Sequence, residues 1–142
     1  MTQTIAARWA TEQDKPFLET AGVTRLPERV LRRKIEGQEV VIVLSGGRPV
    51  GYAYVDYLWS YVPFIATIWV SEGERNRGVG RSIVGFLADD TRAKGGEVIY
   101  SSSQCDETEP QAWHRRVGFE ECGILAGHNE GVGELFFRKR VD

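Results

Sequence analysis

The sequence predicts an α/β fold in which helices cover the faces of a mixed β-sheet. Three observations predict it. Runs of β-branched and apolar residues such as Val40–Leu44 alternate along the chain with segments of helical period. Residues 64–70 are apolar on both faces, as is typical of a central strand. Glycine and proline mark most boundaries between these segments, so elements of both kinds are expected within one chain.

The predicted elements follow in the order strand, two helices, three strands, helix, strand, helix and two strands. The strands are expected at residues 5–10, 40–44, 50–59, 64–70, 98–100, 119–126 and 133–141. The helices are expected after an N-cap at Thr11, from Pro27 to Gly37, from Val79 to Gly95, and from a capping box at Thr108–Gln111 to Gly118.

The chain has 142 residues without an internal repeat or a linker, so a single domain spanning residues 1–142 is expected. Apolar residues make up 42% and charged residues 27%, which is typical of a soluble globular protein. No apolar run is long enough to cross a bilayer, and residues 1–8 lack the pattern of a secretory signal. We therefore expect a cytoplasmic protein that has no membrane partner.

The formal net charge of −2 argues against nucleic acid as a partner. The two cysteines, Cys105 and Cys122, and the two histidines, His114 and His128, are scattered without the close pairing of a zinc site. No metal is therefore expected. Positive charge is nevertheless concentrated locally, because three arginines fall within residues 75–81, and this favours a small anionic ligand.

The segment Arg75–Gly80, which reads Arg-Asn-Arg-Gly-Val-Gly between a strand and a helix, is the most informative part of the sequence. Glycine lets the backbone approach a ligand closely, and the first turn of a helix has N–H groups that lack a partner in the helix. A phosphate group suits this position. Ile83 stands where the dinucleotide fingerprint requires a glycine, and no lysine is present for a nucleotide P-loop. A basic surface loop that only caps the helix remains the alternative.

Two motifs resemble those of the GNAT superfamily of N-acetyltransferases. Ile68–Val70 followed by Arg75–Gly80 is similar to the acetyl-CoA signature Arg/Gln-x-x-Gly-x-Gly/Ala, and Trp113–Phe119 resembles the later aromatic-Tyr-x-x-x-Gly-Phe pattern. The opening Arg8–Asp14 also looks like the first strand and helix start of the family. The resemblance implies a GNAT-like fold, with a mixed, mostly antiparallel central sheet of about seven strands flanked by helices.

The resemblance also implies a ligand and the residues that hold it. The donor is acetyl-CoA, whose pantetheine arm bonds the backbone of the strand and whose pyrophosphate lies among backbone N–H groups of the following helix start. The implied cofactor-binding residues are Ile68, Trp69, Val70, Arg75, Asn76, Arg77, Gly78, Val79, Gly80, Arg81 and Ser82. The acetyl group passes to a primary amine by direct attack in a ternary complex, so the protein is expected to be an acyltransferase.

The expected catalytic residue is His114, which stands where the family usually has the tyrosine that protonates the departing thiolate. An imidazolium is able to donate a proton, since its unperturbed pKa is near neutrality. A histidine that caps or packs beside Trp113 is the alternative. Glu107 departs from the family's asparagine and is assigned no contact, and Arg116 suits either the ribose phosphate or solvent. Three nearby carboxylates, Asp56, Glu72 and Glu74, are expected to be exposed, so no general base is assigned.

The acceptor amine is not identified by the sequence: an amino acid, a polyamine, an antibiotic and a protein amine all remain open. Residues 52–64 are rich in aromatic side chains, of which Tyr54, Tyr57 and Trp59 are candidates for lining an acceptor site. Aromatic residues are more often core or homodimer contacts, so a homodimer is also considered. Two other functions compete with catalysis: a module that binds or senses acetyl-CoA without turnover, and an interaction domain without a cofactor.

Overall fold

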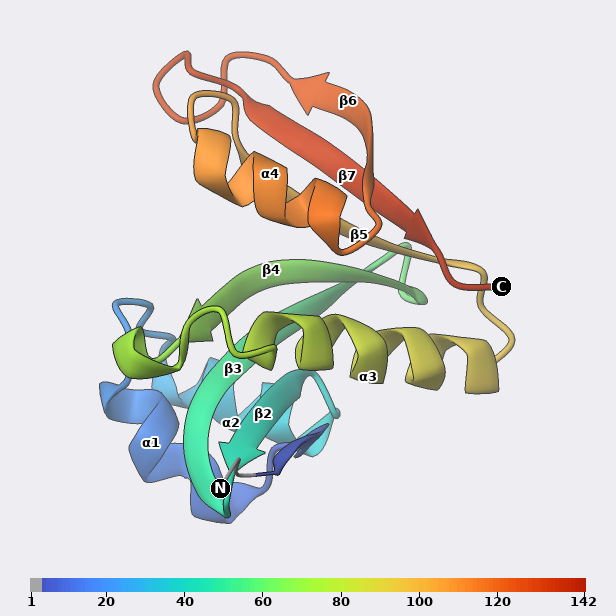
Figure 1. Ribbon diagram of the computed structural model, residues 1–142. Coiled ribbons are helices and arrows are strands. Elements are labelled where there is room, and N and C mark those ends of the chain that lie inside the picture. The colour runs from blue at the N-terminus through green and yellow to red at the C-terminus, as the bar shows by residue number, and fades with distance from the viewer. Residues whose placement is uncertain (1–3) are drawn as a thin grey trace. The chain divides into compact units, whose positions relative to one another are not determined.

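The structure, a computed structural model, describes residues 4–142. Residues 1–3, on which the expectation of no secretory signal partly rests, lie outside the described residues. Residues 4–142 contain seven strands, β1 (Ile5–Trp9), β2 (Val40–Ser45), β3 (Arg48–Leu58), β4 (Val62–Val70), β5 (Val98–Gln104), β6 (Glu120–Leu125) and β7 (Glu134–Arg140). Four α-helices join them (Figure 1), α1 (Lys15–Thr20), α2 (Glu28–Glu36), α3 (Val79–Ala93) and α4 (Thr108–Arg116).

The predicted fold class and element order are confirmed. The strands form one sheet in the order β1-β2-β3-β4-β5-β7-β6. The pairings of β1 with β2, β2 with β3, β5 with β7 and β6 with β7 are antiparallel, and that of β4 with β5 is parallel at Phe64↔Tyr100 and Ile65↔Ser101. Two short 3-10 turns, η1 (Glu12–Asp14) and η2 (Glu72–Glu74), are added to the predicted elements.

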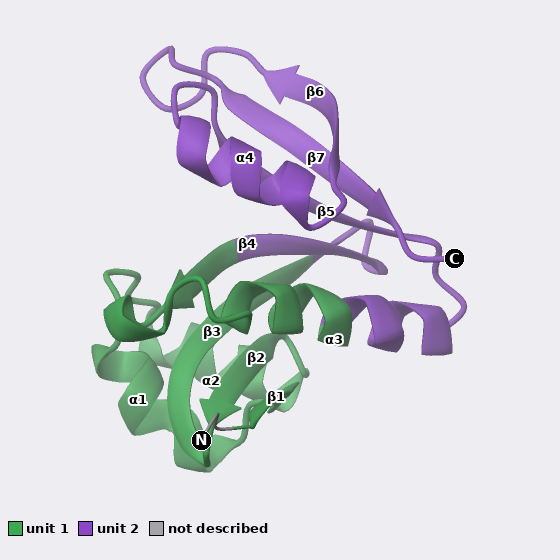
Figure 2. Ribbon diagram, in the orientation of Figure 1, with its two compact units in different colours: residues 1–56, 67–86 green, residues 57–66, 87–142 purple. Residues whose placement is uncertain are grey.

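Contacts between Cα atoms group the chain into two compact units (Figure 2). Unit 1 comprises residues 1–56 and 67–86, and unit 2 comprises residues 57–66 and 87–142. The strand β4 and the helix α3 each contribute residues to both units. The single domain over residues 1–142 stays a prediction.

The core of unit 1 lies between the sheet and the two N-terminal helices. The alternating pattern of β2 directs Val40 and Ile42 to this core, while Val41 is buried on the opposite face. The buried members of the cluster are Ala10, Leu18, Leu31, Ile35, Val40, Ile42, Tyr52 and Tyr54. Trp69 of β4 packs against the same cluster and stacks on Tyr52 with ring centroids 5.6 Å apart. The end of β4 is therefore anchored by aromatic packing.

The pairing of β2 with β3 contains an irregularity. Val43 pairs with Gly51 but the next residue, Leu44, pairs with Pro49, so Val50 is an extra residue on β3. An extra residue of this kind is a β-bulge, which redirects the backbone groups of the strand locally. Val50 is fully buried, and its carbonyl accepts a hydrogen bond from the Ser71 N–H at 2.8 Å. The bulge therefore ties β3 to the residue that follows β4.

Unit 2 is built around β5 and β7, which pair along seven residues. Alternate side chains of β5 are buried, namely Ile99, Ser101 and Ser103. Phe137 of β7 and His114 of α4 are buried as well, and their rings stack with centroids 4.4 Å apart. The polar residues Ser101 and His114 therefore lie within the packed interior of unit 2.

The predicted capping box at the start of α4 is wrong. The helix begins at Thr108, and its N-cap is Glu107 rather than Thr108. The Gln111 side chain, which the box needs, instead donates to the carbonyl groups of Gln104 and Cys105. Glu107 accepts a hydrogen bond from the Gln104 N–H, so the preceding turn uses the polar groups that a box would require.

Candidate functional site

The segment predicted to hold the cofactor lies entirely within unit 1. Residues 75–82, called the cofactor loop below, connect η2 to the first turn of α3. The first hydrogen bond of the helix runs from the Ser82 N–H to the Gly78 carbonyl at 2.9 Å. The N–H groups of Val79, Gly80 and Arg81 precede this bond and have no earlier helical turn to donate to. The helix dipole adds partial positive charge at the same place.

The backbone of the cofactor loop is unusual at alternate residues. Asn76 and Gly78 have φ angles of +63° and +88°, in the left-handed region. Such turns direct successive N–H groups toward one side and form anion-binding concavities. A Cβ atom at Gly78 would meet nothing within 4 Å, so the glycine is needed for its conformation and leaves open space beside the backbone. These features fit a phosphate group.

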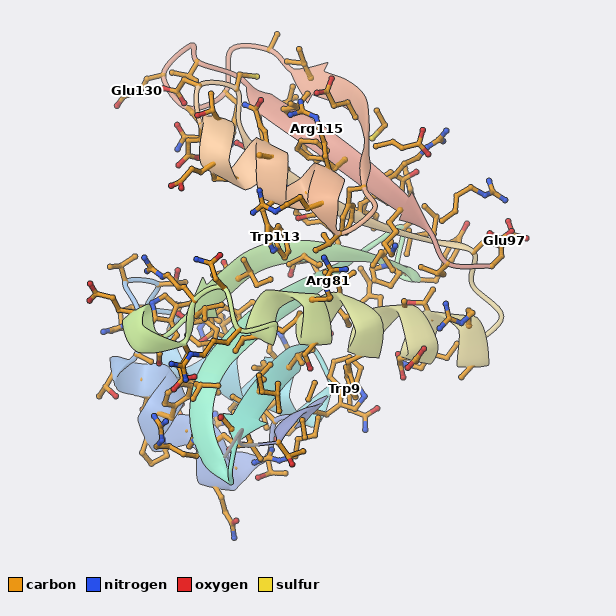
Figure 3. All side chains as sticks on the ribbon, in the orientation of Figure 1. Trp9, Arg81, Glu97, Trp113, Arg115 and Glu130 are labelled. Atoms are coloured by element: carbon orange, nitrogen blue, oxygen red, sulfur yellow. The ribbon has the colours of Figure 1, made fainter. Side chains whose placement is uncertain are left out.

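The three arginines of the cofactor loop differ in their partners. The prediction that Glu74 is exposed is wrong, since Glu74 is buried. Its carboxylate forms ion pairs with Arg48 at 3.0 Å and with Arg77 at 3.8 Å. Arg77 is therefore shared with a carboxylate that braces the loop. Arg75 and Arg81 are both exposed, and no ion pair involves them among residues 4–142. Figure 3 labels Arg81 on the first turn of α3. Their charge is free to meet an anion.

The strand residues Ile68–Val70 lie immediately before this segment, also within unit 1. In the described register of β4 with β5, the last pair is Ile65↔Ser101, and Ile68–Val70 come after it. All three are partly buried. The predicted cofactor residues from Ile68 to Ser82 are thus contiguous on one strand end, one turn and one helix start.

Sequence reasoning missed Gly51 of β3 as a neighbour of the cofactor loop. A Cβ atom at Gly51 would lie 2.7 Å from Cγ1 of Val79 and 2.9 Å from the carbonyl oxygen of Trp69. The signal was present in the sequence, because a glycine within a strand often marks the close approach of another backbone.

His114 lies in the interior of unit 2, where its side chain is 4% exposed. One ring nitrogen, Nδ1, is 2.7 Å from the Pro110 carbonyl oxygen, and the other, Nε2, is 2.8 Å from Oγ of Ser101. Its ring stacks on Phe137 and meets the edge of Phe119. Both nitrogens are therefore engaged by unit 2 itself.

These contacts determine the protonation of the ring. A carbonyl oxygen only accepts, so Nδ1 carries the proton that it donates to Pro110. Burial lowers the pKa of His114, with the hydrogen bond to Pro110 acting in the opposite direction. In the neutral ring Nε2 is an acceptor, and Ser101 then donates its hydroxyl proton to it. This arrangement supports the packing interpretation, and the role of His114 as an acid stays a prediction.

The aromatic residues singled out in the sequence fall into two groups. Tyr54 is buried in the core of unit 1, and burial raises its pKa to about 12. Trp59 and Tyr61 lie at the turn between β3 and β4 and are 73% and 76% exposed. A role for Tyr54, Tyr57 or Trp59 at an acceptor site stays a prediction.

The remaining polar candidates are placed as follows. Asp56 is exposed and pairs with Lys34 at 2.7 Å, and Glu72 is exposed on η2. Arg116 is exposed at the end of α4. In residues 4–142 no three His, Cys, Asp or Glu side chains gather as ligands for a metal ion. Of the helices described, none combines the length and apolar character needed to cross a bilayer.

Comparison with known proteins shows the family to which the chain belongs. The model of the Acetyltransferase (GNAT) family matches residues 6–119, which include the cofactor loop and α4. The chain is 36% identical over 101 residues to the N-alpha-acetyltransferase RimI of Mycobacterium tuberculosis. That match covers 69% of this chain and 62% of the relative, so the chain spans less than two thirds of the relative's length.

Solved structures show the same fold at low sequence identity. The ribosomal-protein-alanine N-acetyltransferase of Brucella melitensis matches 94% of this chain and 98% of its own, with a TM-score of 0.75 and 23% identity. The structure of yncA from Salmonella typhimurium, solved with acetyl-CoA, matches 97% of this chain and 94% of its own, with a TM-score of 0.72 and 16% identity.

Proposed function

This chain belongs to the Acetyltransferase (GNAT) family, and from that premise we propose that it transfers the acetyl group of acetyl-CoA to a primary amine by direct attack in a ternary complex. The acetyltransferase activity that this membership supports is part of the proposal. The donor used by this chain, the acceptor and the order of events are our proposal. The observation that carries it is the cofactor loop, where left-handed turns, helical N–H groups and two unpaired arginines coincide.

The cofactor loop has the chemistry to hold a pyrophosphate. Backbone N–H groups from Arg77 to Arg81 provide donors at the positive end of the α3 dipole, whereas the predicted Ser82 N–H is engaged by the Gly78 carbonyl. Arg75 and Arg81 add charge, since a guanidinium matches phosphate geometry. The open space beside Gly78 supports the close approach of the ligand to the backbone. The backbone groups of Ile68 and Val70 are proposed to bond the pantetheine amides.

When bound, acetyl-CoA supplies an acetyl group already activated as a thioester. The chain's own residues then have three tasks: polarising the carbonyl, accepting a proton from the amine and donating one to the departing sulfur. We propose that a backbone N–H of Ile68–Val70 performs the first. No general base is assigned, because Asp56 is paired and Glu74 is engaged by arginines. No metal takes part in this scheme.

The similarity to an N-alpha-acetyltransferase supports an N-terminal α-amine as the acceptor to test first. An α-amine has a lower pKa than a lysine amine, so a larger fraction is deprotonated and nucleophilic near neutral pH. The free amino acids, polyamines and antibiotics remain the comparison set. Side-chain lysine peptides of matched sequence provide the control.

A second function is favoured by one observation. Both nitrogens of His114 are engaged within unit 2, so a proton donor to the sulfur is not evident at the position where relatives have tyrosine. A chain that lacks this donor but keeps the cofactor loop would bind acetyl-CoA without fast turnover. This second candidate is a module that senses acetyl-CoA.

Calorimetry with CoA and acetyl-CoA, followed by thiol release with the amine panel, tests these functions in order. We expect heat of association and a rise in Tm with CoA, because a ligand that binds only the folded chain stabilises it. Thiol release with an α-amine peptide then supports the enzyme. Binding without release supports the sensing module. Absence of both heat and a Tm shift at millimolar CoA contradicts the proposal.

A further inference from the structure

Gly51 occupies a position in β3 where a glycine carries a cost. It pairs with Val43 in the interior of the sheet and is buried. A glycine within a strand loses more conformational freedom on folding than any other residue and packs no side chain. Gly51 is not among the glycines with a left-handed φ, so its backbone conformation does not require glycine. The reason for a glycine must therefore be space.

The space at Gly51 is taken by two different parts of the cofactor site. A Cβ atom there would lie 2.7 Å from Cγ1 of Val79, the first residue of α3, and 2.9 Å from the carbonyl oxygen of Trp69 near the end of β4. Both distances are shorter than real Cβ atoms show, and the second involves backbone that no rotamer change can move. Gly51 thus lets β4 and α3 approach β3 together.

The neighbouring bulge holds the same strand end by a hydrogen bond. The Val50 carbonyl accepts from the Ser71 N–H at 2.8 Å, and Ser71 is the residue directly after β4. Without the bulge, a regular β3 would offer a different set of backbone groups at this point. Val50 therefore fixes the end of β4 by a hydrogen bond. Gly51, which has no side chain, sets the distance between that strand end and α3.

We propose that Val50 and Gly51 are positioning residues that set the distance between the end of β4 and the start of α3, and thereby the geometry of the cofactor loop. All the groups involved lie in unit 1. The consequence for CoA rests on the proposed function, whereas the consequence for the backbone does not. Neither residue is assigned a contact with the ligand.

The test substitutes Gly51→Ala and compares it with Gly73→Ala. Gly73 lies on η2, and a Cβ atom there would meet nothing within 4 Å, so this control adds the same methyl group without a collision. A third variant combines Gly51→Ala with Val79→Ala, which removes the Cγ1 atom from the crowded contact. Amide hydrogen exchange at Ser71 and Ser82, and calorimetry with CoA, are measured for each at a temperature where all are folded.

For Gly51→Ala we expect faster exchange at Ser71, whose hydrogen bond to Val50 is displaced, and a loss of CoA affinity of about tenfold. Gly73→Ala is expected to match the wild type in both measurements. The double variant is expected to recover part of the affinity, which a general loss of stability would not explain.

Two outcomes overturn the inference: unchanged exchange at Ser71 in a folded Gly51→Ala chain, or equal losses of CoA affinity in Gly51→Ala and Gly73→Ala. If Gly51→Ala fails to fold, Val79→Ile enlarges the same contact from the helix side, and normal exchange at Ser71 and Ser82 in that variant overturns it. A wild-type chain that binds no CoA contradicts the proposed function, and hydrogen exchange then still decides whether Val50 and Gly51 set the backbone.

Discussion

Several polar groups of the cofactor loop in unit 1 are unpaired, whereas both ring nitrogens of His114 in unit 2 are paired. In the loop, Arg75 and Arg81 are exposed, and the first N–H groups of α3 have no earlier helical turn to pair with. Around His114, both ring nitrogens have partners and the ring is stacked within the interior. Both segments were predicted as functional from motifs of similar length.

Exposure to solvent decides which of these polar groups stay available to a ligand. Unsatisfied donors at an exposed position cost little, because water replaces the missing ligand. Unsatisfied groups in an interior are costly, so a buried histidine acquires partners whether or not it has a catalytic role. The N–H groups of the loop therefore stay available to a ligand, whereas both nitrogens of His114 are paired in the interior of unit 2.

Gly78→Asp carries the largest expected effect. Its carboxylate would sit at the residue before α3, accept from the free N–H groups and repel the pyrophosphate, so CoA affinity should fall by about a hundredfold or more. Gly78→Asn has nearly the same shape without the charge and serves as the control, with a smaller loss expected. Titration calorimetry measures both. Equal affinities of Gly78→Asp and the wild type would remove the cofactor loop from the proposed function.

Removing His114 tests the other side of the contrast. His114→Ala deletes a buried stacked ring and leaves Ser101 without its acceptor, so the free energy of unfolding should fall by about 2–4 kcal/mol. CoA affinity of the folded chain is expected to change little. Urea unfolding and calorimetry measure these two quantities.

A catalytic role of His114 predicts a change in kcat for the same variant. If His114 donates the proton to the thiolate, kcat should fall in folded His114→Ala and the upper limb of the pH profile should shift. Ser101→Ala keeps the imidazole but removes its hydroxyl partner. This variant therefore distinguishes a catalytic role of His114 from a packing role. Wild-type kcat in folded His114→Ala would leave the histidine with packing alone.

How far the sequence predicts each region follows from the same physics. The order of elements, the seven strands and the position of the cofactor loop were predictable, since periodicity, glycine and proline act over a few neighbouring residues. The capping box at Thr108 failed because Gln111 bonds carbonyl groups before the helix, a choice that depends on the path of the preceding turn.

The side-chain partners of Glu74 and His114, which lie far away in the sequence, were not predictable. Glu74 was expected to be exposed, but Arg48, 26 residues earlier, reaches its carboxylate and allows it to be buried. The engagement of His114 likewise depends on Ser101 of β5, whose hydroxyl faces α4 only once the strand register is set. Motifs identified the segments, and tertiary contacts determined what their side chains do.

The pH dependence of stability reports on the protonation of His114. Burial lowers the pKa of the folded ring below the 6.5 expected when unfolded, so the unfolded chain binds more protons just below pH 6.5. Stability should therefore fall as pH falls from about 6.5 toward the folded pKa, with a slope of at most about 1.4 kcal/mol per pH unit from this group. His114→Gln should lack this slope. An identical pH dependence in both chains would show that the ring is not held neutral.

The arginines of the cofactor loop are expected to differ in a smaller effect. Arg75→Gln and Arg81→Gln should each weaken CoA binding by about twofold to fivefold, more at low salt than at high salt, because both charges are exposed. Arg77→Gln should in addition speed hydrogen exchange in residues 74–78, since Arg77 faces the buried Glu74. Equal behaviour of all three variants in both measurements would contradict the division between a bracing arginine and two free ones.

Gly85 provides a test of how far along α3 the proposed ligand site extends. It is exposed in the interior of the helix, and a Cβ atom there would meet nothing within 4 Å. Alanine in place of an exposed helical glycine stabilises by about 0.5–1 kcal/mol, because the unfolded chain loses freedom and the folded chain gains no strain. Gly85→Ala should therefore raise the free energy of urea unfolding by this amount with CoA affinity unchanged. If CoA affinity falls instead, the ligand reaches beyond the first turn of α3. Gly85 then lies at the ligand site, as proposed for Gly78, and is not ordinary solvent-facing helix surface.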